Sequence, residues 1–273
     1  MTNNYERVPT YLNQAYTDPK SDTKYFLSKK GVRATLLAGY SIGVVMIISL
    51  MMVAYAVIFA TPLNEDEFIV YRSMLIYASI WMGIFLLLPG IYCGMYSVLL
   101  SISAGGRATM QDLFKYYTSP RMYIRSVGIF LRSNWYLLGI GCMLIVNMAG
   151  SVLSGMIENE TLSRAVMGIF NGALNFYLIF GGIVWGFVRK RASIFLPYAI
   201  ENPQVSLKQC ASVSRSINPF YYAKSYPYDF IVTLLWLLLS LATVGILFVV
   251  HVGPTMMAKK ICFYRSSMVN KFI

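Results

Sequence analysis

Long apolar stretches alternate with short charged stretches along the chain. The first apolar stretch covers residues 34–60 and carries no charge. About 20 apolar residues cross the hydrocarbon core of a bilayer, so this stretch is long enough to cross it with some tilt. Further apolar stretches cover residues 74–103, 127–157, 165–188, 228–242 and 245–264. The pattern therefore predicts an all-α fold, a polytopic transmembrane helix bundle with six membrane segments.

Polar stretches connect these segments and predict what lies outside the membrane. Residues 1–33 and 266–273 are expected to form cytoplasmic tails, the second one short. The stretches 112–117 and 205–216 have the composition of short interfacial helices on the cytoplasmic side. Residues 192–200 are apolar but too short to cross again, so we expect them to run along the cytoplasmic surface.

The stretch 226–264 has two interpretations. It crosses the membrane once, which gives five segments, or it crosses twice with a turn at Gly245. Two crossings leave helices of about 14 residues, or about 21 Å, which is short of the ~30 Å hydrocarbon core. Two crossings also place Lys259, Lys260 and Arg265 on the same side as the other basic loops. That agreement favours six segments over five.

Composition supports a membrane protein. The chain is 57% hydrophobic and only 12% charged, with a mean hydropathy of +0.58. Soluble domains carry about 25% charged residues, so the apolar surplus must face lipid. The net charge is +12, but the cations lie in short runs between apolar segments. This arrangement argues against nucleic acid as a partner and favours anionic cytoplasmic lipid.

The cations also predict the orientation of the chain. Suppose that both termini and the loops 103–125 and 189–228 share one side. Together with Arg132, that side then holds all of the 23 Lys and Arg except Arg72 and Arg164. Cytoplasmic loops carry an excess of Lys and Arg. We therefore expect a multi-pass protein of the cell (plasma) membrane with a cytoplasmic N-terminus and a cytoplasmic C-terminus.

A few positions inside the apolar segments could break a helix or act chemically. Pro89, Gly245 and Pro254 are the expected helix breaks. His251 is the only histidine, and it is either a proton relay or substrate contact, or a partner for a backbone carbonyl freed near Pro254.

Three asparagines, Asn147, Asn171 and Asn175, lie in the third and fourth segments. Asn171 and Asn175 are four residues apart and share one helix face. The asparagines line a polar path or form interhelical hydrogen bonds, and the second is the commoner role of such residues in a bundle. The Gly168-x-x-x-Gly172 pattern is typical of close helix approach.

No catalytic or cofactor motif is present in the sequence. There is no Walker loop, HExxH or GxSxG pattern, and the four cysteines are isolated. The sequence therefore predicts neither an enzyme nor a metal or cofactor site.

Short motifs in the chain follow an order that has a counterpart in a known family. The C-terminal part carries Trp236, Thr243-Val244-Gly245, Pro254 and Phe263-Tyr264, preceded by Tyr198, Glu201-Asn202-Pro203 and serines 212–216. The earlier part carries Pro89, Gly94, Gly106-Arg107 and Asp112-Leu113-Phe114. In this order and spacing the chain resembles a bacterial family of uncharacterised polytopic membrane proteins called domain of unknown function 975. Gly181-Gly182-Ile183 and Thr255 depart from the family pattern. The resemblance implies a fold and a membrane location, and no activity.

Two functions fit these observations. The first is a non-enzymatic membrane component related to transport or export, which would need an ATPase or other membrane-protein partner because the chain has no nucleotide-binding loop. The alternative is a membrane scaffold or regulator that acts through its basic cytoplasmic surface, including Arg189, Lys190 and Arg191.

Overall fold

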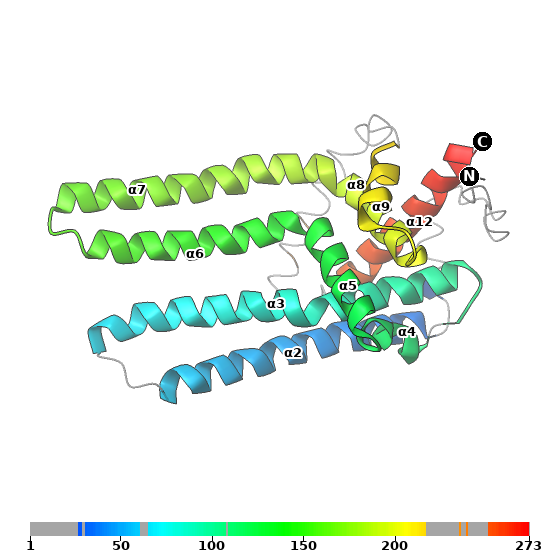
Figure 1. Cartoon of the computed structure of the whole chain (residues 1–273), viewed down its shortest axis with the longest axis horizontal. Coiled ribbons are helices and arrows are strands. Elements are labelled where there is room, and N and C mark those ends of the chain that lie inside the picture. Colours follow the sequence, from blue (N-terminus) through cyan, green and yellow to red (C-terminus); the bar gives the residue numbers. More distant parts are fainter. Residues whose placement is uncertain are drawn as a thin grey trace.

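The computed structural model describes residues 27–28, 31–60, 65–107, 109–216, 235, 239 and 251–272. Every element in these residues is helical (Figure 1). The elements are α2 (Val32–Ala60), α3 (Glu65–Ser103), α4 (Met110–Phe114), a 3₁₀ turn (Lys115–Tyr117), α5 (Pro120–Ser133), α6 (Trp135–Gly155), α7 (Glu160–Phe176), a π-helical turn (Tyr177–Gly181), α8 (Gly182–Glu201), α9 (Leu207–Ser216) and α12 (Gly253–Phe272).

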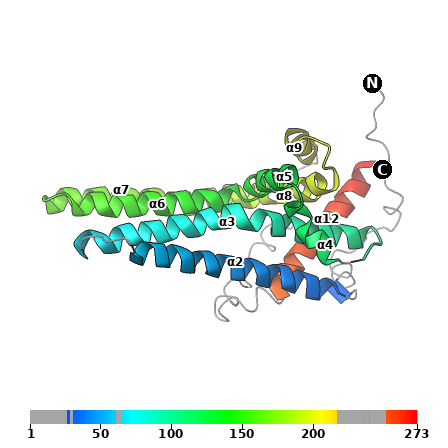
Figure 2. The same cartoon turned by 60° about the horizontal axis from the view of Figure 1, so that its bottom comes forward.

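Two long helical hairpins project from a compact end. Helix α2 packs along α3, and α6 packs along α7. Both views place α4, α5, α8, α9 and α12 together at one end of these hairpins (Figures 1 and 2). Four stretches of the described residues are long and apolar enough to cross a membrane, and they are Val32–Val53, Leu86–Ser103, Leu138–Gly155 and Glu160–Val184.

The structure supports four of the six predicted segments. Apart from Leu235 and Leu239, the predicted segment 228–242 lies outside the described residues, and so does Gly245. The last predicted segment was placed at 245–264, followed by a tail. Helix α12 instead continues through Phe272, and it packs against α8 and α3 in the compact end. Beyond residue 264, Arg265, Ser267 and Met268 are buried and extend the packed face of the helix, and the predicted end of the membrane segment stays a prediction.

The predicted third segment, 127–157, is two helices. Helix α5 begins at Ser119, whose Oγ accepts a hydrogen bond from the Met122 amide (3.3 Å), with Pro120 in the first turn. It ends at Asn134, whose amide and side chain both donate to the Phe130 carbonyl. Helix α5 is amphipathic and crosses the direction of the long helices, whereas α6 runs along them (Figure 1). The polar pair Ser133-Asn134 ends α5. The apolar content of residues 127–157 had predicted a single segment in place of α5 and α6.

Helices α7 and α8 form one continuous rod through the π-helical turn. The hydroxyl of Tyr136 donates to the Leu178 carbonyl in this turn (2.8 Å), and its ring stacks on Tyr177. Gly181 leaves room for Tyr136, because a Cβ there would lie 3.0 Å from its ring. The rod begins at Glu160, with Asn159 as its N-cap, five residues earlier than the sequence predicted.

Two further connecting stretches differ from the prediction. The stretch 192–200 is the C-terminal half of α8, and it is buried in the core instead of lying on a surface. Helix α8 packs against α3, α5 and α12, and these helices remove the apolar side chains of the stretch from solvent. The loop predicted before residue 74 is helical from Glu65 onward.

The predicted interfacial stretches do form short helices. Helix α9 opens with a capping box, in which Gln209 donates its backbone amide to Ser206 Oγ (3.3 Å) and its side-chain oxygen accepts from the Ser206 backbone amide (3.2 Å).

Helix α3 ends in a Schellman motif, with Gly105 at a φ of 84° and the Gly106 amide bonded to the Ser101 carbonyl (2.9 Å).

Candidate functional site

An ion pair between a buried arginine and a partly buried glutamate joins α12 to α8 in the compact end. The guanidinium of Arg265 bonds to the carboxylate of Glu201, although Arg265 is only 2% exposed. The hydroxyl of Tyr264 donates to the second oxygen of the same carboxylate (2.6 Å). Removing a guanidinium and a carboxylate from water costs several kcal/mol for each ion, so this geometry is maintained only because both charges are well bonded.

The pair is also anchored to α3. Nε and Nη2 of Arg265 donate to Ser103 Oγ at 3.0 and 2.8 Å. The Ser103 hydroxyl donates in turn to the Leu100 carbonyl (2.7 Å). Three helices far apart in the sequence therefore meet at a single bonded network, and bonds to charged groups are the stronger kind.

A second arginine fixes the end of α8. Nη2 of Arg125, on α5, donates to the carbonyls of Ala199 (3.0 Å) and Asn202 (2.9 Å). These carbonyls lie at the C-terminus of α8, where the helix dipole favours a cation. Asn202 closes the same end, because its side chain and amide both donate to the Tyr198 carbonyl. Helix α5 is thereby locked to the last turn of α8.

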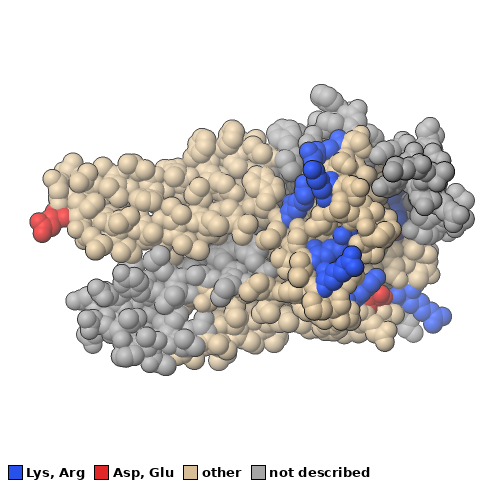
Figure 3. All heavy atoms as spheres, viewed as in Figure 1, with Lys and Arg blue, Asp and Glu red and all other residues tan. Residues whose placement is uncertain are grey.

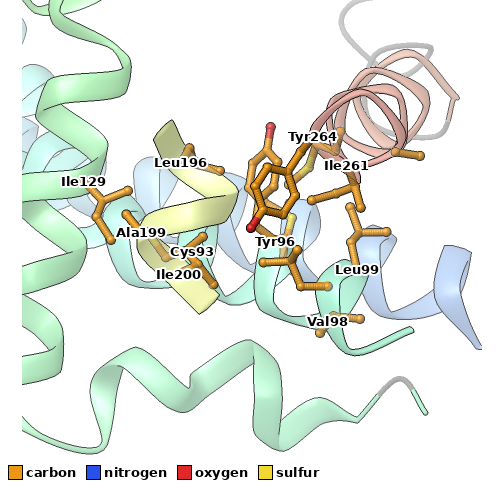
Figure 4. Close-up of a cluster of buried hydrophobic side chains, with 14 of the residues drawn as sticks. Cys93, Tyr96, Val98, Leu99, Ile129, Leu196, Ala199, Ile200, Ile261 and Tyr264 are labelled. Atoms are coloured by element: carbon orange, nitrogen blue, oxygen red, sulfur yellow. The ribbon is translucent and has the colours of Figure 1, made fainter. Parts of the chain in front are cut away.

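Apolar packing surrounds these polar contacts. Cys93, Leu99, Ile129 and Leu196 are fully or almost fully buried, and they come from α3, α5 and α8. Figure 4 shows this cluster, with Tyr264 and other side chains of α12 closing its far side. The core explains why the charged network is held in one geometry.

Helix α4 packs unusually close to α3. A Cβ placed on Gly94 would collide with the backbone carbonyl of Leu113, so only glycine permits this approach. Leu113 itself is fully buried. Thr109 caps α4 by accepting from the Asp112 amide (3.2 Å), and it donates to the Asp112 carboxylate (2.6 Å).

Pro89 lies inside α3, and the helix continues through it. Proline disturbs the hydrogen bonds of the preceding turn. The hydroxyls of Tyr117 and Tyr123 donate to the carbonyls of Leu87 and Leu86 in this turn. Burial raises the pKa of Tyr117, which keeps its phenol protonated as a donor. Pro89 therefore does not end the helix, and the turn before it is where Tyr117 and Tyr123 bind α3.

Apart from Arg164 in the first turns of α7, the described cations gather over the compact end. Lys115, Arg121, Arg132, Lys208 and Arg215 are all exposed there. Figure 3 shows this basic region, and it shows acidic side chains at the opposite turn, between α6 and α7. On this face the basic side chains are therefore concentrated at one end of the long axis.

The asparagines predicted from the sequence are partly brought together. Nδ2 of Asn147 donates to Oδ1 of Asn171 (2.9 Å), which is an interhelical hydrogen bond between α6 and α7. The side chain of Asn175, one turn further along α7, is exposed. Gly168 and Gly172 meet nothing within 4 Å among the described residues, so their motif does not bring α7 close to α6. Instead Gly150 is where α6 admits a side chain of α7, that of Phe170.

The remaining predicted positions are separate from the buried network. His251 is exposed, and its backbone carbonyl accepts a hydrogen bond from Thr255 Oγ1 (2.6 Å) across the start of α12. Pro254 is buried in the first turn of α12. Arg189, Lys190 and Arg191 lie on α8, and their side chains are outside the described set.

Sequence reasoning missed Arg265, Glu201 and Arg125 as site residues. Arg265 counts as a tail cation in the sequence, and Arg125 as a loop cation. One signal was available for Glu201, since it belongs to the Glu-Asn-Pro step that ends α8.

No known protein family, curated protein or solved structure matches the chain. The resemblance to the uncharacterised bacterial family stays a prediction. Two of its motif positions are nevertheless in direct contact, because Tyr264 bonds to Glu201.

Proposed function

We propose that the chain is a non-enzymatic membrane component of a transport or export system. In this proposal it is embedded in the cell membrane by six segments and has both termini in the cytoplasm. The observation that carries the proposal is the division of the molecule into two long helical hairpins, one of which, α6–α7, has few buried residues, and one compact, basic end. None of the described side chains of α7 is buried by the chain itself. Lipid or a neighbouring subunit has to cover such a helix.

The compact end supports a structural role more than a catalytic one. The buried guanidinium of Arg265 and the partly buried carboxylate of Glu201 bond to each other and to neighbouring hydroxyls. Active transport would then draw energy from a partner, and an ATPase is the partner class that fits a chain without a nucleotide-binding loop.

Co-purification tests the proposal. The full chain, tagged and extracted in mild detergent, is expected to carry an ATPase subunit with it and to support uptake or export when both are reconstituted. A monomeric preparation with no partner, and with no substrate that raises its melting temperature, would count against a transport role.

Cysteine accessibility tests the orientation. Glu158 and Lys208 are exposed at opposite ends of the molecule, so each is replaced by cysteine in a Cys142→Ala background. A membrane-impermeant maleimide added to whole cells is expected to label position 158 and not position 208. Labelling in the reverse order would invert the proposed orientation.

The alternative is a scaffold or regulator that binds an acidic partner through its basic surface. The exposed cations on α5 and α9 favour this function. Neutralising Arg189, Lys190 and Arg191 with glutamine should then abolish partner binding while leaving the melting temperature unchanged. If transport is lost while binding persists, the first function holds and the scaffold is rejected.

A further inference from the structure

Helix α5 lies at the boundary between the exposed hairpins and the compact end. Helix α3 has 39 residues and is about 58 Å long, nearly twice the ~30 Å hydrocarbon core. In its part Leu86–Ser103, 67% of the residues are buried, whereas 17% are buried in the apolar stretch Leu138–Gly155 and 6% in the apolar stretch Glu160–Val184. The part of the molecule that is exposed to lipid is therefore the part that lies at the height of α6 and α7 along the long axis.

One hydrogen bond and the chain connection to α6 hold α5 at the edge of the lipid-exposed part. Near its start, the hydroxyl of Tyr123 bonds to the carbonyl of Leu86, at the beginning of the buried part of α3. At its end, Asn134 leads directly into α6. Helix α5 thus runs across the molecule where the exposed hairpins begin (Figures 1 and 2).

Large apolar side chains are exposed along this edge. Met110 and Phe114 of α4 are 50% and 39% exposed, and Ile124 of α5 is 69% exposed. Aromatic rings connect the two helices. The ring centroid of Tyr117 lies 6.5 Å from that of Phe114 on α4 and 5.8 Å from that of Tyr123 on α5. Exposed apolar side chains therefore lie on two helices that these ring contacts hold side by side.

Exposed cations accompany these apolar side chains. Lys115 follows Phe114, and Arg121 lies one turn before Ile124. Asp112 is the only acidic residue between 107 and 132, and its carboxylate is engaged by the Thr109 cap. Apolar side chains that enter the acyl boundary beside cations at headgroup level are the pattern by which interfacial helices bind anionic lipid.

We propose that α4 and the first half of α5 form a binding surface for anionic phospholipid, with Lys115 and Arg121 on the headgroup phosphate and Phe114 and Ile124 beside the acyl chains. An acidic protein would satisfy the cations but would leave Ile124 without an apolar environment at this level. The proposal requires only that the hairpins span a bilayer, and it holds whichever partner the chain engages.

Lipid titration tests the surface on the full chain in neutral detergent. Phosphatidylglycerol is expected to raise the melting temperature, and phosphatidylcholine with the same acyl chains is not. A basic residue near an anionic surface contributes about fivefold in affinity. The K115Q/R121Q variant should therefore need roughly 25-fold more phosphatidylglycerol for the same shift. The matched control is K208Q/R215Q, which removes two exposed cations from α9 at the same end of the molecule.

Several results would overturn the proposal. An equal loss in K208Q/R215Q would mean that general charge, not this surface, attracts the lipid. An equal shift with phosphatidylcholine, or with glycerol phosphate alone, would remove the anionic lipid as the ligand. Both variants must melt as the wild type does in detergent alone, which keeps a folding defect separate from lost binding.

A site-specific probe gives an independent measurement. Ile124→Cys in a Cys142→Ala background carries an environment-sensitive dye, since the other three cysteines are buried. In phosphatidylglycerol bilayers the dye emission is expected to shift to shorter wavelength and to resist quenching by iodide. A dye at this position that is fully quenched in both lipids places Ile124 in water, and the surface is then not a lipid site.

Discussion

Arg265 and Glu201, 64 residues apart in the chain, form an ion pair that joins α12 to α8, with the arginine buried and the glutamate partly buried. A residue that counts as a tail cation in the sequence is thus a central anchor of the compact end. The pair makes the last helix part of the core, and it connects the two motif ends, Glu-Asn-Pro and Phe-Tyr, that the sequence offered separately.

Replacing Glu201 with glutamine should destabilise the protein strongly. The substitution leaves Arg265 buried without a balancing charge, and breaking a buried pair in this way costs about 3–5 kcal/mol. Reversible unfolding in mixed micelles, followed by circular dichroism, measures the change in the free energy of unfolding. The double variant Glu201→Leu with Arg265→Met should recover most of the loss, because apolar side chains of similar volume replace both charges.

The exposed ion pair between Glu160 and Arg164 is the control. It lies at the start of α7, with both side chains more than three-quarters exposed. A pair at this spacing on a helix surface contributes about 0.3–0.5 kcal/mol. If Glu201→Gln costs no more than Glu160→Gln, the buried pair does not hold α12 in place.

Gly94→Ala should separate α4 from α3. Its new methyl group would collide with the Leu113 carbonyl, which is backbone and cannot rotate away. Forced overpacking of this kind costs about 1–3 kcal/mol. Gly168→Ala is the matched control, because a methyl group there meets nothing within 4 Å. The melting temperatures of the two variants test this prediction. Equal values would contradict the close packing of α4 against α3 at Gly94.

The sequence predicted the helical class and four of the apolar segments, because hydrophobic length is a local property. It did not separate α5 from α6, since the apolar character of residues 127–157 concealed the break at Asn134. The local signals for that break, Ser119-Pro120 and Ser133-Asn134, were present but short.

The buried network was beyond sequence reasoning for another reason. Glu201, Ser103 and Arg265 come from three helices, and no spacing in the chain predicts that they meet. The same holds for the burial of residues 192–200, which depends on the apolar surface that α3 and α12 supply. Positions chosen for being polar within apolar segments, such as His251 and Asn175, turned out to be exposed.

The hydrogen bond between Asn147 and Asn171 should couple α6 to α7 weakly. Side-chain hydrogen bonds inside membrane bundles contribute about 0.6 kcal/mol on average. A double-mutant cycle with Asn147→Leu and Asn171→Leu is expected to give a coupling energy near this value. A cycle that pairs Asn147→Leu with Asn175→Leu should give none. Coupling of similar size in both cycles would point to a polar path instead of one discrete bond.

Tyr136→Phe should weaken the π-helical turn between α7 and α8. The phenol donates to the Leu178 carbonyl at 2.8 Å, and a bond of this kind contributes about 1 kcal/mol. Tyr177→Phe is the control, because its hydroxyl reaches the Tyr136 carbonyl only at 3.4 Å. Amide hydrogen exchange around residues 177–182 is expected to accelerate in the first variant more than in the second. The reverse order would assign the support of the turn to Tyr177.

Cys210 should make the compact end less stable in alkaline solution. Burial raises the pKa of its thiol, with the nearby Arg125 opposing part of that shift. The folded state therefore holds the proton to a higher pH than the unfolded state, whose thiol pKa is about 8.5. This contribution to stability is complete below about pH 8.5 and is lost as the pH rises through the folded value, by at most about 1.4 kcal/mol per pH unit. Cys210→Ala should remove that slope from the free energy of unfolding measured between pH 7 and 10. Cys142→Ala, which removes an exposed thiol, should keep it, and identical profiles for Cys210→Ala and the wild type would show that this thiol does not titrate differently on folding.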